Sequence, residues 1–499
     1  MRQLSKSKIL AYRQCPKRLW LEIHRPGLKD DSSAETAYRI GNEVGEVARR
    51  IYDKNGDGVF IDIDTLGFER GFAQSAELLI EGKGPVFEAG FRIPGALAFA
   101  DVMLPDDSEG TVRWHMIEVK SSAGVKDYHR DDIAVQSFVA ESAGVELASV
   151  SLAHVDTTFV YGGEGDYEGL LKEVDFTLEV NSRRGEVGEW LEAAQAVASL
   201  PVEPEIATGD QCSNPFPCAF CTYCGQDENA VDYPLSSLPN FSGRRRDAVE
   251  ALGIHDLREV PDEFLSPIQK RVRDVTRSGE IFLDSAGAAA DLKGLEFPVR
   301  FLDFESVMLA VPVWKGTRPY QQIPFQFSLH CLDKAGSLTH ESFLDLSGAD
   351  PSEALAKALI RVCGDQGPVF AYNAAFERMV IRDLAKRFPS MSASLLEILA
   401  RVVDLLPVAK ARYYHPDQHG RWGLKSVLPA ACPELSYDHL DGVADGAMAV
   451  EAFKEAVDSR TSPGRKGEIE RELLAYCHLD TLGLVRLWEV LSGRDGRAE

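Results

Sequence analysis

The chain has 499 residues, a net charge of −24 and a sequence pI near 5.0. This acidity argues against a protein that binds nucleic acid through its whole surface, because affinity for phosphate comes from Lys and Arg side chains that replace counterions. The length favours several domains, and without a run of about 18 apolar residues we expect a cytoplasmic protein with no signal peptide and no membrane span.

Basic residues gather in three tracks, which would contact phosphate locally despite the overall charge. The tracks are Lys6, Lys8, Arg13, Lys17 and Arg18, then Arg244, Arg245 and Arg246, then Lys270, Arg271, Arg273 and Arg277. Each track is equally consistent with a solvated helix face.

The first segment, residues 1–225, alternates expected strands with expected helices, and this order predicts an α/β domain. The expected helices span residues 34–52 and 133–143. The expected strands span residues 86–93, 97–104, 114–119 and 150–161.

The middle segment, residues 226–295, lacks strand patterns and predicts short helices broken at Gly253 and Pro261. Two interpretations remain open, a plain helical linker and a helical hairpin whose amides contact the DNA backbone. Residues 296–499 open with the strand FPVRFLDFES and contain a second strand, PVFAYN, with several helices. This last segment is again predicted to be α/β.

Three charged residues in the first segment form a candidate metal-dependent site. Asp101 lies on one expected strand, and Glu118 and Lys120 lie on the next. Glu118 and Lys120 share one face because strand side chains alternate. Carboxylates bind Mg²⁺ or Mn²⁺, and the lysine would orient a water or stabilise charge on phosphate. A chance Glu-x-Lys pair in a highly charged chain is the alternative.

The surroundings of these residues resemble the RecB-like branch of the PD-(D/E)XK nucleases, which includes the CRISPR-associated adaptation exonucleases and the AddB-type repair nucleases. The resemblance covers residues 1–225 and rests on LSKSKILAYRQCPKRLW, IGNEVGEVAR, Asp101, IEVKSS and Gln136. It implies that Gln136 lies close to the catalytic Lys120 and contacts nucleic acid or the active centre.

The sequence departs from that family at two positions. The family's GxxxH metal ligand is missing, because Gly45 stands four positions after Gly41. Glu43 or Glu46 would substitute, and we favour Glu46 as the metal ligand. Ala140 stands where the family has the tyrosine of its QxxxY motif.

Four of the nine cysteines fall in CSNPFPCAFCTYC, at Cys212, Cys218, Cys221 and Cys224. An odd count with one dense cluster indicates a metal site rather than a disulfide framework. A zinc site made by these four thiolates alone and an iron–sulfur cluster both remain open at this point.

The RecB-like resemblance implies a 4Fe–4S cluster with one ligand before the nuclease core and three after it. On that basis Cys15, Cys212, Cys218 and Cys224 are the expected ligands, with Cys221 as the spare cysteine. Such a cluster would join the two ends of the domain in the way that a disulfide does.

A second acidic constellation lies in the last segment. Asp303 and Glu305 alternate on the strand FLDFES and therefore point to one side. Glu377 follows PVFAYN. Tyr476 and Asp480 are four residues apart, which places them on one face of a helix.

This order resembles the DEDD exonuclease branch of the RNase H-like fold, over about residues 296–490. The resemblance implies that Asp303, Glu305 and Asp480 hold two Mg²⁺ ions and that Tyr476 positions the attacking water. Glu377 stands where that branch has aspartate; Asp404 is a further acidic candidate and Lys425 a candidate for substrate contact. The whole chain resembles a bacterial family of unknown function that joins a RecB-like nuclease to such a domain.

Together these features predict a Mg- or Mn-dependent deoxyribonuclease that removes nucleotides from DNA ends, in repair or defence. One alternative is a nucleic-acid-binding or assembly protein with degenerate nuclease folds, which the three departures from the family patterns favour. Another is a zinc-stapled scaffold with no role on nucleic acid. Substrate polarity, DNA versus RNA and any protein partner stay open.

Overall fold

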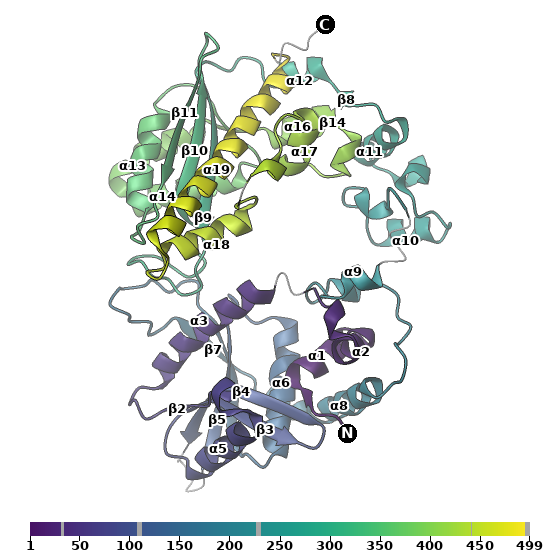
Figure 1. Ribbon diagram of the computed structural model, residues 1–499, viewed down its shortest axis with the longest axis vertical. Helices are drawn as coiled ribbons and strands as arrows, with labels where there is room; N and C mark the ends of the chain where they lie inside the picture. The colour runs from purple at the N-terminus through teal and green to yellow at the C-terminus, as the bar shows by residue number, and fades with distance from the viewer. Residues whose placement is uncertain (31–33, 107–111, 226–230, 441, 495–499) are drawn as a thin grey trace. The chain divides into compact units, whose positions relative to one another are not determined.

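The computed structural model describes residues 1–30, 34–106, 112–225, 231–440 and 442–494 (Figure 1). The chain forms two compact units. The first is Met1–Glu228 with Leu309–Tyr320, and the second is Asn229–Met308 with Gln321–Glu499. Both combine sheets with helices, so the predicted α/β class is confirmed. Within the described ranges, no helix combines the length and apolar character needed to cross a membrane.

The first unit is built on a sheet with the order β2-β3-β4-β5-β6-β7, in which β1 also pairs with β4. Its strands are β1 (Leu4–Ser5), β2 (Val59–Phe60), β3 (Val86–Ile93), β4 (Ala96–Asp106), β5 (Arg113–Lys120), β6 (Leu147–Val155) and β7 (Leu171–Asp175). The strands β3, β4 and β5 are antiparallel, whereas β6 runs parallel to β5. The parallel step needs a crossover, which α6 (Asp127–Ser142) supplies.

Helices cover both faces of this sheet. Ile133, Val135 and Val139 of α6 pack in the main core with Met116 of β5, while Val44 and Val47 of α3 (Ala34–Tyr52) pack on Val155. The remaining helices are α1 (Lys6–Gln14), α2 (Pro16–His24), α4 (Ile63–Leu66), α5 (Phe68–Glu81), α7 (Thr177–Ser182), α8 (Arg184–Ala198) and α9 (Cys221–Cys224).

The predicted elements of the first unit are present, with one clear difference in length. The strand β6 ends at Val155, although the sequence predicted a strand to residue 161. Asp156 stops it, because its carboxylate accepts a hydrogen bond from the Thr158 amide at 2.8 Å and turns the chain.

The second unit is built on a sheet with the order β11-β10-β9-β12-β13. Its strands are β9 (Val299–Val307), β10 (Ile323–Leu332), β11 (Leu338–Leu344), β12 (Val369–Ala371) and β13 (Val402–Asp404). The first three are antiparallel, and β12 and β13 continue the sheet in parallel with β9. The predicted strands FPVRFLDFES and PVFAYN correspond to β9 and β12.

The two faces of this sheet differ in chemistry. Leu302, Phe304, Phe327 and Leu329 point to one face and pack on α13 (Ser352–Cys363), α14 (Ala375–Arg387) and α15 (Ser392–Ala400). The long helix α19 (Pro463–Ser492) lies along β9 and β10 (Figure 1). The strand face with the opposite parity carries polar side chains, namely Asp303, Glu305, Gln326, Ser328 and His330.

The expected linker is part of the second unit rather than a separate segment. Its elements are α10 (Arg244–Glu250), α11 (Pro267–Ser278), β8 (Phe282–Leu283) and α12 (Ser285–Asp291), while α16 (Leu406–Arg412), β14 (Tyr413–Tyr414), α17 (Leu424–Ala431) and α18 (Gly446–Val457) follow later. The strand β8 pairs with β14, and Arg412 forms ion pairs with Asp284 and Asp291. These contacts tie the segment to residues far along the chain.

Residues 309–320, between β9 and β10, belong to the first unit. The Gly316 amide donates to the Tyr161 carbonyl at 2.8 Å, and the Tyr320 hydroxyl donates to the Ser121 carbonyl. Ala310 is buried in a cluster with Val44 and Leu170. This excursion was not predicted, because local sequence carries no signal for which unit a loop joins.

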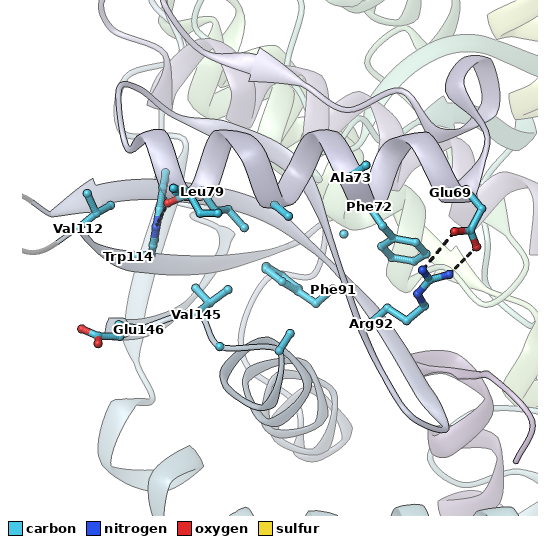
Figure 2. A pocket seen from close by; sticks show the side chains of 15 residues that line it. Glu69, Phe72, Ala73, Leu79, Phe91, Arg92, Val112, Trp114, Val145 and Glu146 are labelled. Carbon is cyan, nitrogen blue, oxygen red and sulfur yellow. Dashed lines mark hydrogen bonds and ion pairs between the residues drawn. The ribbon is translucent and has the colours of Figure 1, made fainter.

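An apolar hollow lies between α5 and the outer part of the first sheet. Phe72, Phe91 and Trp114 line it, and an ion pair between Glu69 and Arg92 lies at one end (Figure 2). None of the residues predicted to form a site is among those that line this hollow. We assign no role to it.

Candidate functional site

The predicted acids of the first unit meet across three neighbouring strands. The register pairs Val102 with Ile117, which sets Asp101 directly opposite Glu118. Glu88 occupies the equivalent position on β3, where the backbone has a φ of 56°. Asp101 accepts a hydrogen bond from the Val119 amide at 2.6 Å. The sheet therefore carries a row of three carboxylates.

Two ammonium groups contact Glu118. The Nζ atoms of Lys120 and Lys6 each lie 2.7 Å from Glu118 Oε1. Both also pair with Asp132 of α6, Lys6 at 3.0 Å and Lys120 more closely. The other oxygen of Glu118, Oε2, is buried and has no hydrogen-bond partner among the described residues. That oxygen is a free ligand position next to Asp101.

The electrostatics divide this cluster into two parts. Burial, together with Glu118 and Glu88, raises the pKa of Asp101 well above its usual range. Burial also opposes ionisation of Asp132, but the ammonium groups of Lys120 and Lys6 hold its pKa below the ordinary value. Asp132 is thus a fixed anion, whereas Asp101 gains most from an added cation.

The remaining predicted residues of this unit differ in their placement. Gln136 is fully buried on α6, where its amide donates to the Phe99 carbonyl and its Oε1 has no partner among the described residues. Glu46 is exposed and lines a hollow with Arg49, Arg50 and Asp53. Glu43 is the α3 acid close enough to Tyr320 to affect its pKa, and Tyr320 bonds to Ser121 beside Lys120. Of the two glutamates, Glu43 is thus the one whose charge reaches Tyr320.

The sequence analysis missed two members of the cluster. Asp132 lies four residues before Gln136, so both occupy one helical face, and that spacing was the available signal. Lys6 was predicted only as part of a basic track. The other members of that track form ion pairs with nearby acids, namely Lys8–Glu22, Arg13–Asp131, Lys17–Glu203 and Arg18–Glu22. They fit the alternative of a neutralised helix surface.

Cys15 lines the same small cavity as the cysteines that come about two hundred residues later. The cavity is lined by Cys15, by residues of α2 and by residues of the 206–224 segment, including Cys212, Cys218, Cys221 and Cys224. Gln14 fixes this arrangement, because its amide donates to the carbonyls of Gln211 and Phe216 at 2.9 and 2.8 Å. The expected meeting of the two ends of the domain is therefore present.

These thiols suit two kinds of metal site. Thiolates are ligands of tetrahedral zinc and of iron–sulfur clusters alike. Burial raises the pKa of Cys224 to about 11.

Three predicted acids of the second unit converge. Asp303 and Glu305 of β9 and Asp480 of α19 each offer a carboxylate oxygen, and these oxygens all lie within 4.8 Å of one another. Glu305 is 8% exposed and Asp480 is 6% exposed. We call these residues the carboxylate trio.

Burial raises all three pKa values, and repulsion from neighbouring acids adds to the shifts of Asp303 and Glu305. Burial, followed by Asp480 and Glu305, raises the pKa of Asp303 well above its usual range. Burial and Asp480 raise the pKa of Glu305 to about 8. Burial raises the pKa of Asp480 to about 6, although hydrogen bonds from Tyr437 and Tyr476 and the charge of Lys425 oppose the shift. Three acids that resist joint ionisation favour a multivalent cation between them.

Two tyrosines and one lysine surround the trio. Tyr437 donates its hydroxyl to Asp480 at 2.6 Å, and the predicted Tyr476 lies on the same helix as Asp480. The ammonium of Lys425 lies 5.3 Å and 5.0 Å from the ring centroids of Tyr437 and Tyr476. Tyr437 was not predicted, because no regular spacing links it to the other residues.

Glu377 is 3% exposed at the start of α14, and its Oε2 has no partner among the described residues. Burial, followed by Asp404, raises the pKa of Glu377 to about 7. Its charge also contributes to the raised pKa values of Asp303 and Glu305. Asp404 has a structural role, since it accepts hydrogen bonds from the amides of Asn373 and Leu406 at 2.9 Å.

Residues 300–423 match a family described as a domain of unknown function (DUF2779). The matched region contains Asp303, Glu305 and Glu377, and ends before α19. No curated protein matches the chain.

Proposed function

We propose that the protein is a metal-dependent nuclease that hydrolyses phosphodiester bonds of DNA, and that the carboxylate trio is its principal catalytic centre. The observation that carries this proposal is the convergence of three carboxylates from β9 and α19 within 4.8 Å, two of them buried and that of Asp303 half-buried. Their order along the chain, with Glu377 between them, is the order that the DEDD exonuclease resemblance implies. Exonucleolytic cleavage is the finer part of the proposal and rests on that resemblance.

The trio fits a divalent cation by its chemistry. Hard carboxylate oxygens are the ligands that Mg²⁺ and Mn²⁺ prefer. Burial and the neighbouring acids raise the pKa values of Asp303 and Glu305, and the charge of Lys425 offsets only part of the shift of Glu305. A bound divalent cation would stabilise the ionised carboxylates. When bound, the cation supplies the positive charge that stabilises a phosphoryl transition state.

The chain's own side chains would orient the substrate around this centre. The Tyr476 hydroxyl lies beside Asp480, so it is positioned to hold a water by a hydrogen bond. Lys425 would attract a phosphate from the same side. Glu377 would accept a proton or add a ligand, since its pKa of about 7 lets it change protonation near neutral pH.

The first unit supports a second centre of the PD-(D/E)XK kind. Asp101 and Glu118 face each other, and Lys120 follows on the same strand face. The buried Oε2 of Glu118 and the raised pKa of Asp101 favour a cation between these two acids. Lys120 would stabilise charge on the phosphate.

A 4Fe–4S cluster held by Cys15, Cys212, Cys218 and Cys224 is part of the same proposal. The small cavity that these cysteines share, lined from both ends of the domain, supports it. Cys221 donates its thiol to the Cys212 carbonyl at 3.2 Å and is exposed. Cys221 is accordingly the cysteine that we leave out of the ligand set.

The alternative, a binding protein with degenerate nuclease folds, is favoured in the first unit by Lys6. Its ammonium lies 2.7 Å from Glu118 and 3.0 Å from Asp132, where it neutralises the acids that a cation would need. On this view the first unit binds DNA and the second cleaves it.

The test uses end-labelled single- and double-stranded DNA with Mg²⁺, Mn²⁺ or EDTA. We expect metal-dependent release of labelled products by the wild type and a loss of about 10²-fold or more in Asp303→Asn. Lys120→Ala reports on the first unit separately, and Glu470→Gln, at an exposed position of α19, is the matched control. Undiminished digestion by Asp303→Asn would show that the trio is not the centre. DNA binding in EDTA without cleavage under any metal would select the alternative.

A further inference from the structure

Three histidines from separate elements of the second unit meet at one point. They are His330 of β10, His340 of β11 and His478 of α19. One ring nitrogen of each lies within 4.8 Å of the others. The ring centroids are 4.6, 4.7 and 4.3 Å apart. None of these residues belongs to the carboxylate trio.

The fold fixes this meeting point. His330 and His340 are direct partners in the register of β10 and β11, so their side chains leave the sheet on the same face. That face is the one on which Asp303 and Ser328 are paired. The helix α19 packs against these strands and contributes His478.

Hydrogen bonds orient two of the three rings. His330 Nδ1 lies 2.9 Å from Thr481 Oγ1, and His340 Nε2 lies 2.9 Å from Ser328 Oγ. The Ser328 and Thr481 hydroxyls are in turn 2.7 Å apart. Such contacts to the second ring nitrogen hold metal-binding histidines in one tautomer. They leave Nε2 of His330 and Nδ1 of His340 for a ligand.

We propose that His330, His340 and His478 form a binding site for Zn²⁺ or a similar borderline transition-metal ion. Imidazole nitrogen suits these ions, whereas Mg²⁺ and Mn²⁺ prefer oxygen, so the site selects a different metal from the carboxylate trio. Three protein ligands leave a fourth position for water or another small ligand. His330 is buried and His340 exposed, so that position faces solvent on the His340 side.

Packing alone explains this arrangement less well, because packed rings need not bring their nitrogens to one point. Here the ring centroids lie 4.6, 4.7 and 4.3 Å apart, and one nitrogen of each ring lies within 4.8 Å of the others. A cation between the rings would have these nitrogens as its ligands. Such a cation would also cross-link α19 to β10 and β11, whether or not the protein is catalytically active.

The test is a metal titration of the full-length protein after removal of metals with EDTA. Zn²⁺ binding is measured by competition with a chromophoric chelator, and Co²⁺ is used in parallel for its visible spectrum. We expect His340→Ala to bind one equivalent of Zn²⁺ fewer than the wild type. The difference between the Co²⁺ spectra of the wild type and His340→Ala should show no thiolate charge-transfer band, which a cysteine site would give.

His255→Ala is the matched control, because His255 is also exposed in the second unit and lies outside the cluster. It should keep the full number of equivalents, and His478→Gln should repeat the loss seen for His340→Ala. Equal Zn²⁺ stoichiometry in the wild type and His340→Ala would overturn the proposal. The proposal would also be overturned if His340→Ala lost only Co²⁺ that shows the thiolate charge-transfer band. Neither readout depends on nuclease activity.

Discussion

Replacing Glu305 with glutamine should make the metal-free protein more stable while it removes the metal site. Burial and Asp480 raise the pKa of Glu305 from 4.5 to about 8. Each pH unit between these values corresponds to about 1.4 kcal/mol of differential stabilisation. In EDTA at pH 8, Glu305→Gln should therefore stabilise the second unit by roughly 4 kcal/mol.

The direction of the pH dependence follows from the raised pKa. The folded protein holds the Glu305 proton more tightly than the unfolded chain does, so this stabilisation is complete below pH 4.5 and is lost as the pH rises toward 8. The wild type and Glu305→Gln should differ by only about 1 kcal/mol near pH 5. Their difference should grow steadily between pH 5 and pH 8.

Hydrogen exchange of peptides from β9 and α19 measures this effect locally, which suits a chain of two units better than a single global transition. A gain of roughly 4 kcal/mol corresponds to about a thousandfold slower exchange, in the limit where the opening equilibrium sets the exchange rate. Mn²⁺ should slow exchange in the wild type and not in Glu305→Gln. Glu470→Gln is the control for loss of a charge on α19. A Glu305→Gln protein that exchanges faster than the wild type at pH 8 in EDTA would refute the reasoning.

Four further predictions concern the other sites. Cys15→Ser should abolish the brown absorbance near about 400 nm of anaerobically purified protein, whereas Cys221→Ser should keep it; equal spectra would remove Cys15 from the ligand set. Lys120→Met should slow any cleavage by the first unit about 10²-fold, measured in an Asp303→Asn background, and an unchanged residual rate would assign that rate elsewhere. Lys6→Met removes a half-buried ammonium from the buried Glu118 and should lower the free energy of unfolding by about 3 kcal/mol in EDTA, with partial recovery in Mn²⁺. If saturating Mn²⁺ restored no stability, a cation site there would be contradicted. Tyr476→Phe should reduce kcat about 10²-fold with little change in metal affinity, and a selective loss of metal affinity would contradict a water-positioning role.

Local patterns in the sequence predicted most elements that carry the sites. The strands β3, β5 and β9 and the helix α3 were predicted from periodicity, because each buries one apolar face. The pairs Glu118–Lys120 and Asp303–Glu305 were predicted as units because alternate strand positions share a face. Tyr476 and Asp480 were predicted together from helical spacing.

Residues that reach a site through tertiary packing left little local signal. Lys6 reaches Glu118 because β1 pairs with β4 and starts α1 beside the cluster, which no local pattern encodes. His340 meets His330 through the register of two strands, and His478 joins them from α19. The sequence could not predict that these three histidines meet, because their meeting depends on the register of β10 with β11 and on the packing of α19.

The excursion of residues 309–320 also limits how the protein can be divided. A fragment ending at residue 225 would lack Ala310 and Tyr320, and would leave the apolar side chains of Val44 and Leu170 without part of their cover. A fragment that reproduces the first unit must therefore also include residues 309–320. During synthesis the first unit cannot be completed until the ribosome has passed residue 320, so its last cover arrives after the intervening chain has been made.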